Sequence, residues 1–310
     1  MKNLMKDIAY VRYAHPDLDL MRRFLTDFGL SEVVANKDLL IMRAATGYPC
    51  CYIAHKGPVS KLLSIGVMFG EQGEIDAAAQ WPEASRKFAN PRFDGDALVS
   101  VRDPNGYEFD LLPLRQALPV LEVEAPEPFN FGTVKIRVNH GRRTPPRPPV
   151  VLRLGHVALK VKDVATSMAW YADRFGLLTS DSIYEDSPDN LVTAFMRCNR
   201  GAEYADHHVI ALAAADDVKP HHVSFEVQGL DQVGAGGQWL AHQGYQRLWG
   251  IGRHLLGGQL FDYWRDPYGN NVEHYADGDV FDDRHAATTY QQSLETLYQW
   301  GPPLPADFAD

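Results

Sequence analysis

The sequence predicts an α+β protein of two domains, each built from two βαβββ modules that form a partly open barrel. Three observations support this prediction: a weak internal repeat, the same hairpin signature near the end of both halves, and a proline-rich stretch between them. The expected parts are an N-terminal domain, a linker or crossover, a C-terminal domain and a tail, at residues 1–115, 116–150, 151–278 and 279–310.

The repeat opens with a short alternating strand, a polar turn and an amphipathic helix, first in residues 8–30 and again in residues 155–177. Both copies end in Phe-Gly-Leu. Gly29 and Gly176 therefore stand where the C-terminal cap of a helix requires a left-handed residue. Each half is expected to begin with a strand followed by a helix.

The two halves also close alike, with an Asp-Pro-x-Gly sequence inside residues 101–112 and inside residues 264–275. Asp and Pro start a turn and Gly supplies a positive φ, so each sequence is expected to join the last two strands of its half. Between these ends the C-terminal half has the patterns of several short strands and a second helix, at residues 191–199, 207–214, 221–227 and 230–243.

The stretch from about residue 114 to 150 is rich in proline and charge and has little periodicity, which is typical of a linker. A flexible tether and an irregular, ordered crossover packed on both domains both remain open. The tail after residue 278 carries several aromatic residues, so it is expected to pack as a lid or over the mouth of the barrel.

Composition limits the function classes. Hydrophobic residues make up 45% and charged residues 23% of the chain, as in soluble globular proteins with a sizeable core. A formal net charge of −10 argues against partners such as nucleic acid or an anionic membrane surface. Three cysteines provide no disulfide framework, and no apolar run approaches the roughly 20 residues of a membrane span. A cytoplasmic location is expected.

Eight of the twelve histidines lie between residues 156 and 274, which directs attention to the C-terminal half. His156 opens one expected strand, His222 lies in another, and Glu273 follows the last hairpin. In paired, curved strands three such side chains can converge on one point. Two imidazoles and one carboxylate leave other positions of an ion open, as in non-haem Fe(II) oxygenases, and the lack of thiolates weighs against structural zinc.

Five segments carry a family resemblance: LGHVALKV, ADHHVIAL, HHVSFEV, GRHLLGG and FDYWRDPYGNNVEHY. Through them, residues 152–278 resemble the catalytic domain of type I extradiol (meta-cleaving) catechol dioxygenases, in the vicinal-oxygen-chelate superfamily with its glyoxalase-like fold. The resemblance implies that His156, His222 and Glu273 bind Fe(II), with Mn(II) as the other candidate, and that no organic cofactor is needed.

The resemblance also implies roles for three further side chains. His208 is the expected general acid/base, because imidazole titrates near neutral pH. Tyr263 and His254 are expected to hydrogen-bond substrate oxygen or the bound intermediate.

Two adjacent histidine pairs require a choice. His222 is preferred to His221 because the ligand in the resembled family is the second of the pair, and because His222 shares its strand face with polar residues. His208 is preferred to His207 on the same ground. We expect His207 and His221 to be strand-edge or core residues with hydrogen bonds of their own, and His274 to pack or to face solvent.

The N-terminal half departs from the metal-binding pattern. Aligning the two halves assigns Ala9 to the position of the first ligand, Asp110 to that of the carboxylate, and a position near Ser64 to the second histidine. Since alanine cannot bind a metal, this half is expected to be metal-free and non-catalytic.

Taken together, the resemblance implies cleavage of a catechol-type ring beside its two hydroxyls, with both atoms of O2 inserted, as part of aromatic degradation. A homo-oligomer, dimer or tetramer, is expected. The alternatives are an α-keto-acid dioxygenase of the 4-hydroxyphenylpyruvate type, an isomerase like glyoxalase I, and a non-enzymatic binding protein of the same superfamily. The ring substituents stay open: Arg253 is available to a carboxylated substrate, but nothing in the sequence places it at the site.

Overall fold

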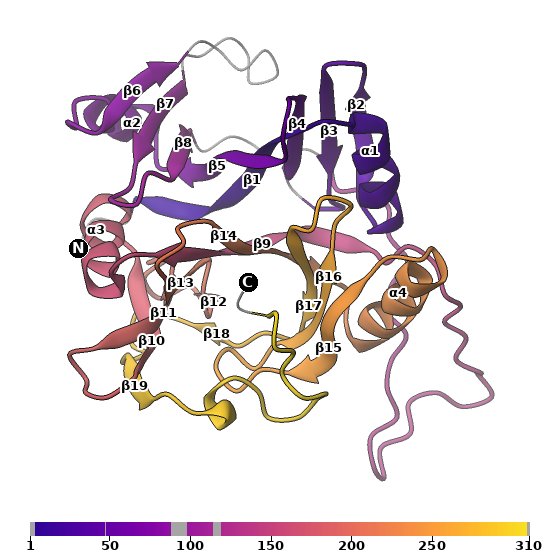
Figure 1. Ribbon diagram of the computed structural model, residues 1–310. Helices are drawn as coiled ribbons and strands as arrows, with labels where there is room; N and C mark the ends of the chain where they lie inside the picture. The colour runs from indigo at the N-terminus through magenta and orange to yellow at the C-terminus, as the bar shows by residue number, and fades with distance from the viewer. Residues whose placement is uncertain (1–3, 47, 88–97, 114–118, 309–310) are drawn as a thin grey trace.

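The structure is a computed structural model that describes residues 4–46, 48–87, 98–113 and 119–308. Two large β-sheets, one from each half of the chain, lie one above the other in Figure 1. The expected domain boundary between residues 115 and 116 lies outside the described residues. Within the described ranges, no helix has the length and apolar character needed to cross a membrane.

The N-terminal sheet contains two βαβββ modules and has the strand order β2-β3-β4-β1-β5-β8-β7-β6. The first strands of its two modules, β1 and β5, pair antiparallel at its centre. Its elements are β1 (Met5–His15), α1 (Leu18–Asp27), β2 (Ser31–Ala35), β3 (Leu39–Arg43), β4 (Tyr52–Lys56), β5 (Lys61–Phe69), α2 (Gln72–Ala78), β6 (Ala84–Lys87), β7 (Leu98–Arg102) and β8 (Glu108–Leu112).

The C-terminal sheet repeats this plan, with the order β15-β16-β17-β14-β9-β13-β11-β10-β19, and β9 and β14 pair antiparallel. A strand of the tail, β19, extends it at one edge. The elements are β9 (Val151–Val161), α3 (Val164–Phe175), β10 (Leu178–Tyr184), β11 (Leu191–Arg197), β12 (Ala205–Asp206), β13 (Ile210–Ala214), β14 (Pro220–Val227), α4 (Leu230–His242), β15 (Arg247–Arg253), β16 (Leu260–Arg265), β17 (Asn271–Ala276), β18 (Val280–Phe281), β19 (Thr288–Gln291) and the 3-10 helix η1 (Leu294–Thr296). Two βαβββ modules in each half confirm the predicted fold class.

The repeated opening segments fold alike because their ends carry the same signals. Asp17 and Asp163 cap α1 and α3, and each side chain accepts a hydrogen bond from the backbone N–H three residues further on. Gly29 and Gly176 follow the helices with positive φ angles of 104° and 69°. A β-carbon on Gly29 would lie 2.2 Å from the carbonyl oxygen of Pro149, so this turn also needs glycine for close packing.

The two halves share one hydrophobic core, which continues from the N-terminal sheet into the C-terminal sheet. At their junction the ring of Phe28 stacks on that of His274, with centroids 3.7 Å apart, and His274 Nε2 donates to the Phe28 carbonyl at 2.8 Å. Of the two expectations for His274, packing is therefore correct. Since His274 adjoins Glu273, the N-terminal half supports β17 from behind.

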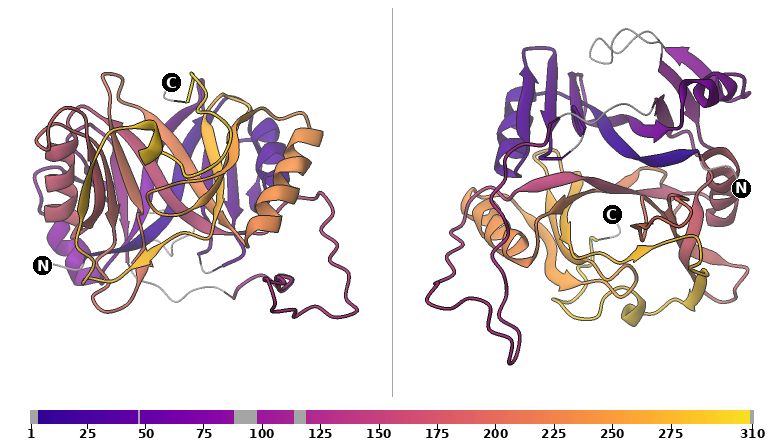
Figure 2. Two further views of the ribbon diagram at one scale, coloured as in Figure 1. Left: turned by 90° about the horizontal axis from the view of Figure 1, so that it is seen from below. Right: turned by 180° about the vertical axis from the view of Figure 1, so that it is seen from behind.

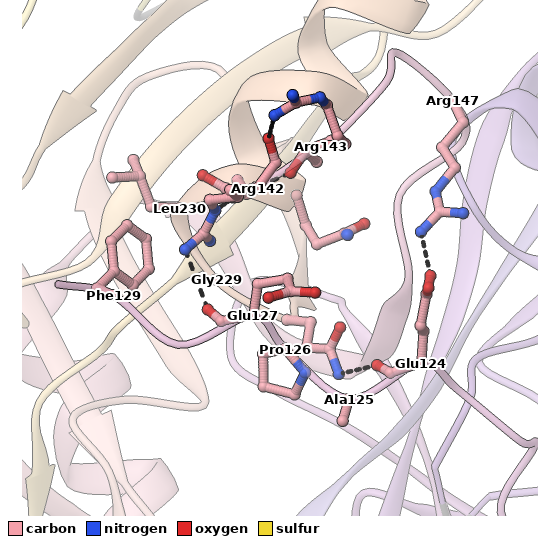
Figure 3. Close-up of a pocket in the computed structure, with 14 residues that line it drawn as sticks. Glu124, Ala125, Pro126, Glu127, Phe129, Arg142, Arg143, Arg147, Gly229 and Leu230 are labelled. Carbon is pink, nitrogen blue, oxygen red and sulfur yellow. Dashed lines mark hydrogen bonds and ion pairs between the residues drawn. The ribbon is translucent and has the colours of Figure 1, made fainter. Parts of the chain in front are cut away.

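The crossover between the halves is irregular but anchored at several points. It runs outside both sheets as a long extended excursion (Figure 2). Arg142 pairs with Asp231 at the start of α4, and Arg147 pairs with Glu124 at 2.6 Å across the excursion (Figure 3). Gln228 Nε2 donates to the carbonyl oxygen of Glu124 at 2.8 Å. The described part of the crossover is therefore irregular and is held by these contacts.

Candidate metal centre and active-site cavity

The three expected metal ligands lie on three neighbouring strands in the middle of the C-terminal sheet. Ser224 of β14 is the register partner of both His156 on β9 and Glu273 on β17. His222 lies two residues before Ser224 and therefore shares its face. The ligand atoms of His156, His222 and Glu273 all lie within 4.8 Å of one another, and the three side chains are buried.

The donor atoms fit a divalent metal ion. The Nε2 atoms of His156 and His222 are 3.2 Å apart, and Oε2 of Glu273 lies 3.3 and 3.6 Å from them. Neighbouring octahedral ligands at roughly 2.1 Å from an ion are separated by about 3 Å. Neither carboxylate oxygen of the buried Glu273 has a hydrogen-bond partner among the described residues. A buried carboxylate without donors is strongly unfavourable, and a bound cation would compensate it.

The protonation states also suit metal binding. Burial alone would raise the pKa of Glu273, but the imidazoles of His156 and His254 outweigh it and hold that pKa well below its ordinary value. Burial lowers the pKa of His222 well below its ordinary value. An ionised carboxylate and a neutral imidazole are the forms that bind metal at neutral pH.

A chain of two hydrogen bonds fixes the tautomer of His222. The carbonyl oxygen of Phe308 can only accept, so His221 Nε2 donates to it at 2.9 Å. Burial lowers the pKa of His221 to about 4, which keeps this ring neutral near pH 7 and makes its Nδ1 an acceptor. His222 Nδ1 lies 2.7 Å from that atom and donates to it. His222 is therefore left with its lone pair on Nε2, the atom that faces the other two ligands.

The other histidine pair has the same arrangement. His207 Nε2 lies 2.8 Å from the carboxylate oxygen Oδ2 of Asp181 and donates to it. His207 Nδ1 then accepts from His208 Nδ1, 2.9 Å away. Burial lowers the pKa of His208 well below its ordinary value. His208 thus presents a basic Nε2 lone pair beside the metal ligands, and its ring centroid lies 4.2 Å from that of His156.

The remaining two expected site residues contact each other. His254 Nδ1 donates to the carbonyl oxygen of Leu297 at 2.8 Å, and its Nε2 accepts from the Tyr263 hydroxyl, 2.9 Å away. Burial, with the negative charge of Glu273 adding to it, raises the pKa of Tyr263 well above its ordinary value. Tyr263 is therefore a protonated hydrogen-bond donor throughout the physiological pH range.

All six expected site residues belong to one region, because a single cavity of about 160 Å³ is lined by five of them and Glu273 lies behind its histidines. An apolar cavity of about 150 Å³ in another protein accommodates benzene, so one aromatic ring fits here. The tail covers the cavity: Thr296, Leu297 and Phe308 line it, and Asp307 holds the tail to Arg265 with an ion pair of 3.0 Å.

In the N-terminal half, the strand register corrects one part of the alignment made from the sequence. Gly66 of β5 is the register partner of both Tyr10 and Asp110, as Ser224 is of His156 and Glu273. The counterpart of His156 is therefore Tyr10 and not Ala9. Register irregularities along β1, one of them between Ile8 and Tyr10, shift its alignment relative to the sequence repeat.

This counterpart position is filled by an arginine ion pair. The buried carboxylate of Asp110 accepts hydrogen bonds from Tyr10 at 2.9 Å, Arg12 at 2.5 Å, Ser64 at 2.6 Å and Ser100 at 2.6 Å. Unlike Glu273, it needs no cation beyond Arg12. Among the described residues, the group of side chains that could hold a metal ion consists of His156, His222 and Glu273.

Three contributors to the site were not anticipated from the sequence. Asp181 and the backbone carbonyls of Leu297 and Phe308 orient histidines over separations of 26, 43 and 87 residues. A carbonyl has no sequence signature, and Asp181 is one of many acidic residues. The adjacent histidine pairs were the available signal, since one ring of each pair can orient the other.

Comparison with known proteins agrees with the fold. Residues 153–274 match the family model described as Glyoxalase/Bleomycin resistance protein/Dioxygenase superfamily. The chain is 31% identical to "Metapyrocatechase 2" of Cupriavidus necator over 94% of its own length and 88% of that protein. It is 34% identical to a "Biphenyl-2,3-diol 1,2-dioxygenase" of Paraburkholderia xenovorans over 87% of each chain.

Two solved structures share the fold. A homoprotocatechuate 2,3-dioxygenase from Arthrobacter globiformis has a TM-score of 0.79 at 18% identity, covering 99% of this chain and 91% of that one. A Mn(II)-bound glyoxalase from Novosphingobium aromaticivorans has a TM-score of 0.79 at 20% identity, covering 96% and 91%. The sequence relatives, which match along nearly the whole chain, distinguish between these two kinds of protein. This chain belongs to the extradiol dioxygenases of the Glyoxalase/Bleomycin resistance protein/Dioxygenase superfamily.

Proposed function

We propose that the protein is an extradiol dioxygenase that cleaves a catechol-type ring beside its two vicinal hydroxyls and inserts both atoms of O2. One observation carries the proposal: the open ligand set of His156, His222 and Glu273 faces a cavity of ring size that also holds His208 and Tyr263. The names of the whole-length relatives support it.

A divalent ion held by His156, His222 and Glu273 supplies a positive charge that lowers the pKa of the substrate hydroxyls and an open position for O2. The protein's part is to hold the ligands in their metal-binding forms. Glu273 stays ionised and His222 keeps its lone pair on Nε2, because their neighbours fix both states.

His208 moves a proton at Nε2. With Nδ1 hydrogen-bonded to His207, its Nε2 can accept a proton from a substrate hydroxyl and return it to the opening ring. The low pKa of this buried ring makes it a neutral base at the start of the reaction. Asp181, reached through His207, stabilises the positive charge that His208 gains.

Tyr263 and His254 orient the substrate. The Tyr263 hydroxyl donates to His254 and can turn to a substrate oxygen, while the Leu297 carbonyl holds the imidazole in place. The tail residues Leu297 and Phe308 close the cavity and exclude water from the ring-opening step. Residues 151–278 are thus the proposed catalytic domain, and residues 1–115 support it without chemistry of their own.

Fe(II) is the metal that we propose, because the histidine and carboxylate donor set is that of non-haem Fe(II) oxygenases. Mn(II) accepts the same donors. Anaerobic reconstitution of the metal-free protein with each ion, followed by assay with catechol, discriminates between them: we expect higher activity with Fe(II), and activity with Mn(II) alone would contradict this choice.

The function is tested by incubating the Fe(II)-loaded protein with catechol in air and following the yellow ring-fission product. Formation of this product together with O2 uptake is the expected result. Turnover of 4-hydroxyphenylpyruvate with CO2 release would instead favour an α-keto-acid dioxygenase. Enzymes of that kind usually carry a C-terminal helix that closes the site, whereas the only helix in the described part of the tail is the short 3-10 helix η1.

We also propose that the protein forms a homo-oligomer in the cytoplasm. The crossover exposes a row of apolar side chains to solvent, a composition typical of contact surfaces: Val120, Val123, Phe129, Phe131, Val134, Ile136 and Val138. The three cysteines are free and buried, which suits a reducing compartment. Light scattering of the purified protein, and its recovery in the cytoplasmic fraction, test these two points; a monomer or a secreted protein would contradict them.

A further inference from the structure

One wall of the cavity consists of small and apolar side chains. It lies on the β13 side of the metal ligands, whereas Tyr263 lies on the other side, across β17. Ala211 of β13 is the register partner of Ala158 on β9 and of Phe195 on β11, and Thr193 is in turn the register partner of Ala213 and Ile183. All of these side chains line the cavity. The three alanines leave space beside the metal ligands that a ring substituent can fill.

The cavity wall carries no fixed charge. Among the described residues that line it there is no lysine, arginine, aspartate or glutamate, and its titratable groups are five histidines and one tyrosine. An anionic substituent on this wall would lose its hydration without gaining an ion pair, which is strongly unfavourable.

Two cations near the site residues in sequence, Arg253 and Lys160, do not change this conclusion. Arg253, which the sequence left available for a carboxylated substrate, donates to the Gly258 carbonyl at 2.5 Å and to Asp277 Oδ2 at 2.7 Å, and it does not line the cavity. Lys160 shares a face of β9 with Ala158 and is buried, but it lies beyond the lining residues.

We infer that the substrate is a catechol whose ring substituent is small, uncharged and apolar, such as a methyl group or a halogen, and that this substituent packs on Ala158, Ala211 and Ala213. Catechols that carry a carboxylate are excluded as good substrates. The inference rests on the proposed ring-cleaving function and names its substrate class.

The test measures kcat/KM of the Fe(II)-loaded protein for catechol, 3- and 4-methylcatechol, 4-chlorocatechol, and 2,3- and 3,4-dihydroxybenzoate. We expect the methyl and chloro compounds to equal or exceed catechol and to exceed the dihydroxybenzoates by at least about 100-fold. A dihydroxybenzoate within ten-fold of the methylcatechols would overturn the inference and leave the proposed function intact. No cleavage of any catechol would overturn the proposed function itself.

Two matched variants locate the substituent. Ala211→Leu fills the wall and should lower kcat/KM for methylcatechol relative to catechol by roughly ten-fold. Ala214→Leu, in the same strand but with its side chain exposed, should leave that ratio unchanged. If the ratio of kcat/KM for methylcatechol to that for catechol were the same in both variants, the substituent would not pack on this wall and the inference would be overturned. The anaerobic dissociation constants of the same compounds, measured by absorbance, should shift in the same direction.

The variant Lys160→Met tests the second of these two cations. If no lysine assists a carboxylate, the ratio of dihydroxybenzoate to methylcatechol turnover should be the same as in the unaltered protein. A further loss of dihydroxybenzoate turnover in this variant would identify Lys160 as a carboxylate partner and overturn the inference.

Discussion

The two pairs of adjacent histidines share one hydrogen-bonding plan, although they serve different purposes. In each pair the first ring gives its Nε2 proton to a fixed acceptor and accepts at Nδ1 from the second ring. The second ring, His208 or His222, then presents its Nε2 lone pair to the site. The sequence predicted the second residue of each pair, and the structure explains what the first residue does.

At the metal centre, the ligands and the acid/base residue should respond differently to substitution. His156→Ala or Glu273→Gln should abolish metal binding, because only two donors remain. His208→Phe should retain the metal and slow turnover by about 10² to 10⁴-fold, since the proton acceptor alone is lost. Metal content after anaerobic loading, measured beside kcat, checks both; full metal content and activity in Glu273→Gln would refute the ligand assignment.

Substitutions of His221 and His207, the first residues of the two pairs, should also have different effects on metal affinity and on kcat. His221→Phe removes the acceptor of the His222 Nδ1 proton and should weaken metal affinity by roughly 10- to 100-fold. His207→Phe removes the equivalent acceptor from His208 and should lower kcat while the metal dissociation constant stays near its original value. Titration of the metal-free variants with Fe(II) gives the affinities. Equal losses of affinity in both variants would contradict the separate roles.

At the scale of elements, the tail lines the proposed active-site cavity. It supplies carbonyl acceptors to His221 and His254, and the ring of Phe308 packs edge-on against those of His221 and Tyr263. The sequence led us to expect a segment over the mouth of the barrel, and the closing role of the tail stays a prediction. The carbonyl contacts of the tail could not be predicted from the sequence. Phe308 is 87 residues from His221, so the position of its carbonyl depends on the path of the whole tail.

Deleting residues 305–310 should open the cavity. The variant loses the Phe308 ring and the acceptor of His221, so KM for catechol should rise and kcat should fall, and the folded core should persist. Asp307→Asn is the control, because it removes only a half-exposed ion pair with Arg265 and should change stability by less than about 1 kcal/mol. Steady-state kinetics of both variants test this; unchanged KM in the deletion would rule out a closing role.

The two sheets show how one module can keep or lose a metal site. In the N-terminal sheet the equivalent carboxylate, Asp110, is neutralised by the guanidinium of Arg12, and Tyr10 replaces the first histidine. The sequence repeat correctly aligned Asp110 with Glu273 and a position near Ser64 with His222. It missed Tyr10 by one residue, because the irregular pairing of β1 with β5 changes the register without leaving a signal in the sequence.

At the scale of the whole molecule, the N-terminal half packs against the C-terminal sheet. His15 belongs to this contact: its ring stacks on Tyr268, with centroids 4.9 Å apart, and its Nε2 lies 2.8 Å from the Tyr52 hydroxyl. The repeat and its hairpins predicted two such halves. The contact surface between them could not be predicted, because it depends on the relative placement of two separately formed sheets.

Acid should weaken this contact. Burial lowers the pKa of His15 from its ordinary 6.5 to about 4, so the unfolded chain binds this proton more readily than the native protein does. The stability contributed by neutral His15 is complete above pH 6.5 and is lost as pH falls toward 4, by at most about 3 kcal/mol. In thermal unfolding of the metal-loaded proteins between pH 7 and 4, the variant His15→Gln should lose less Tm than the unaltered protein. If Tm fell equally with pH in His15→Gln and in the unaltered protein, this role of His15 would be contradicted.

The account as a whole depends on ring opening at the His156, His222 and Glu273 centre. The most direct measurement is mass spectrometry of the product formed from catechol by the Fe(II)-loaded protein, together with the amount of O2 consumed. We predict one O2 per catechol and a product heavier than catechol by two oxygen atoms. A product that has lost two hydrogen atoms and gained no oxygen, or unchanged catechol, would contradict the account.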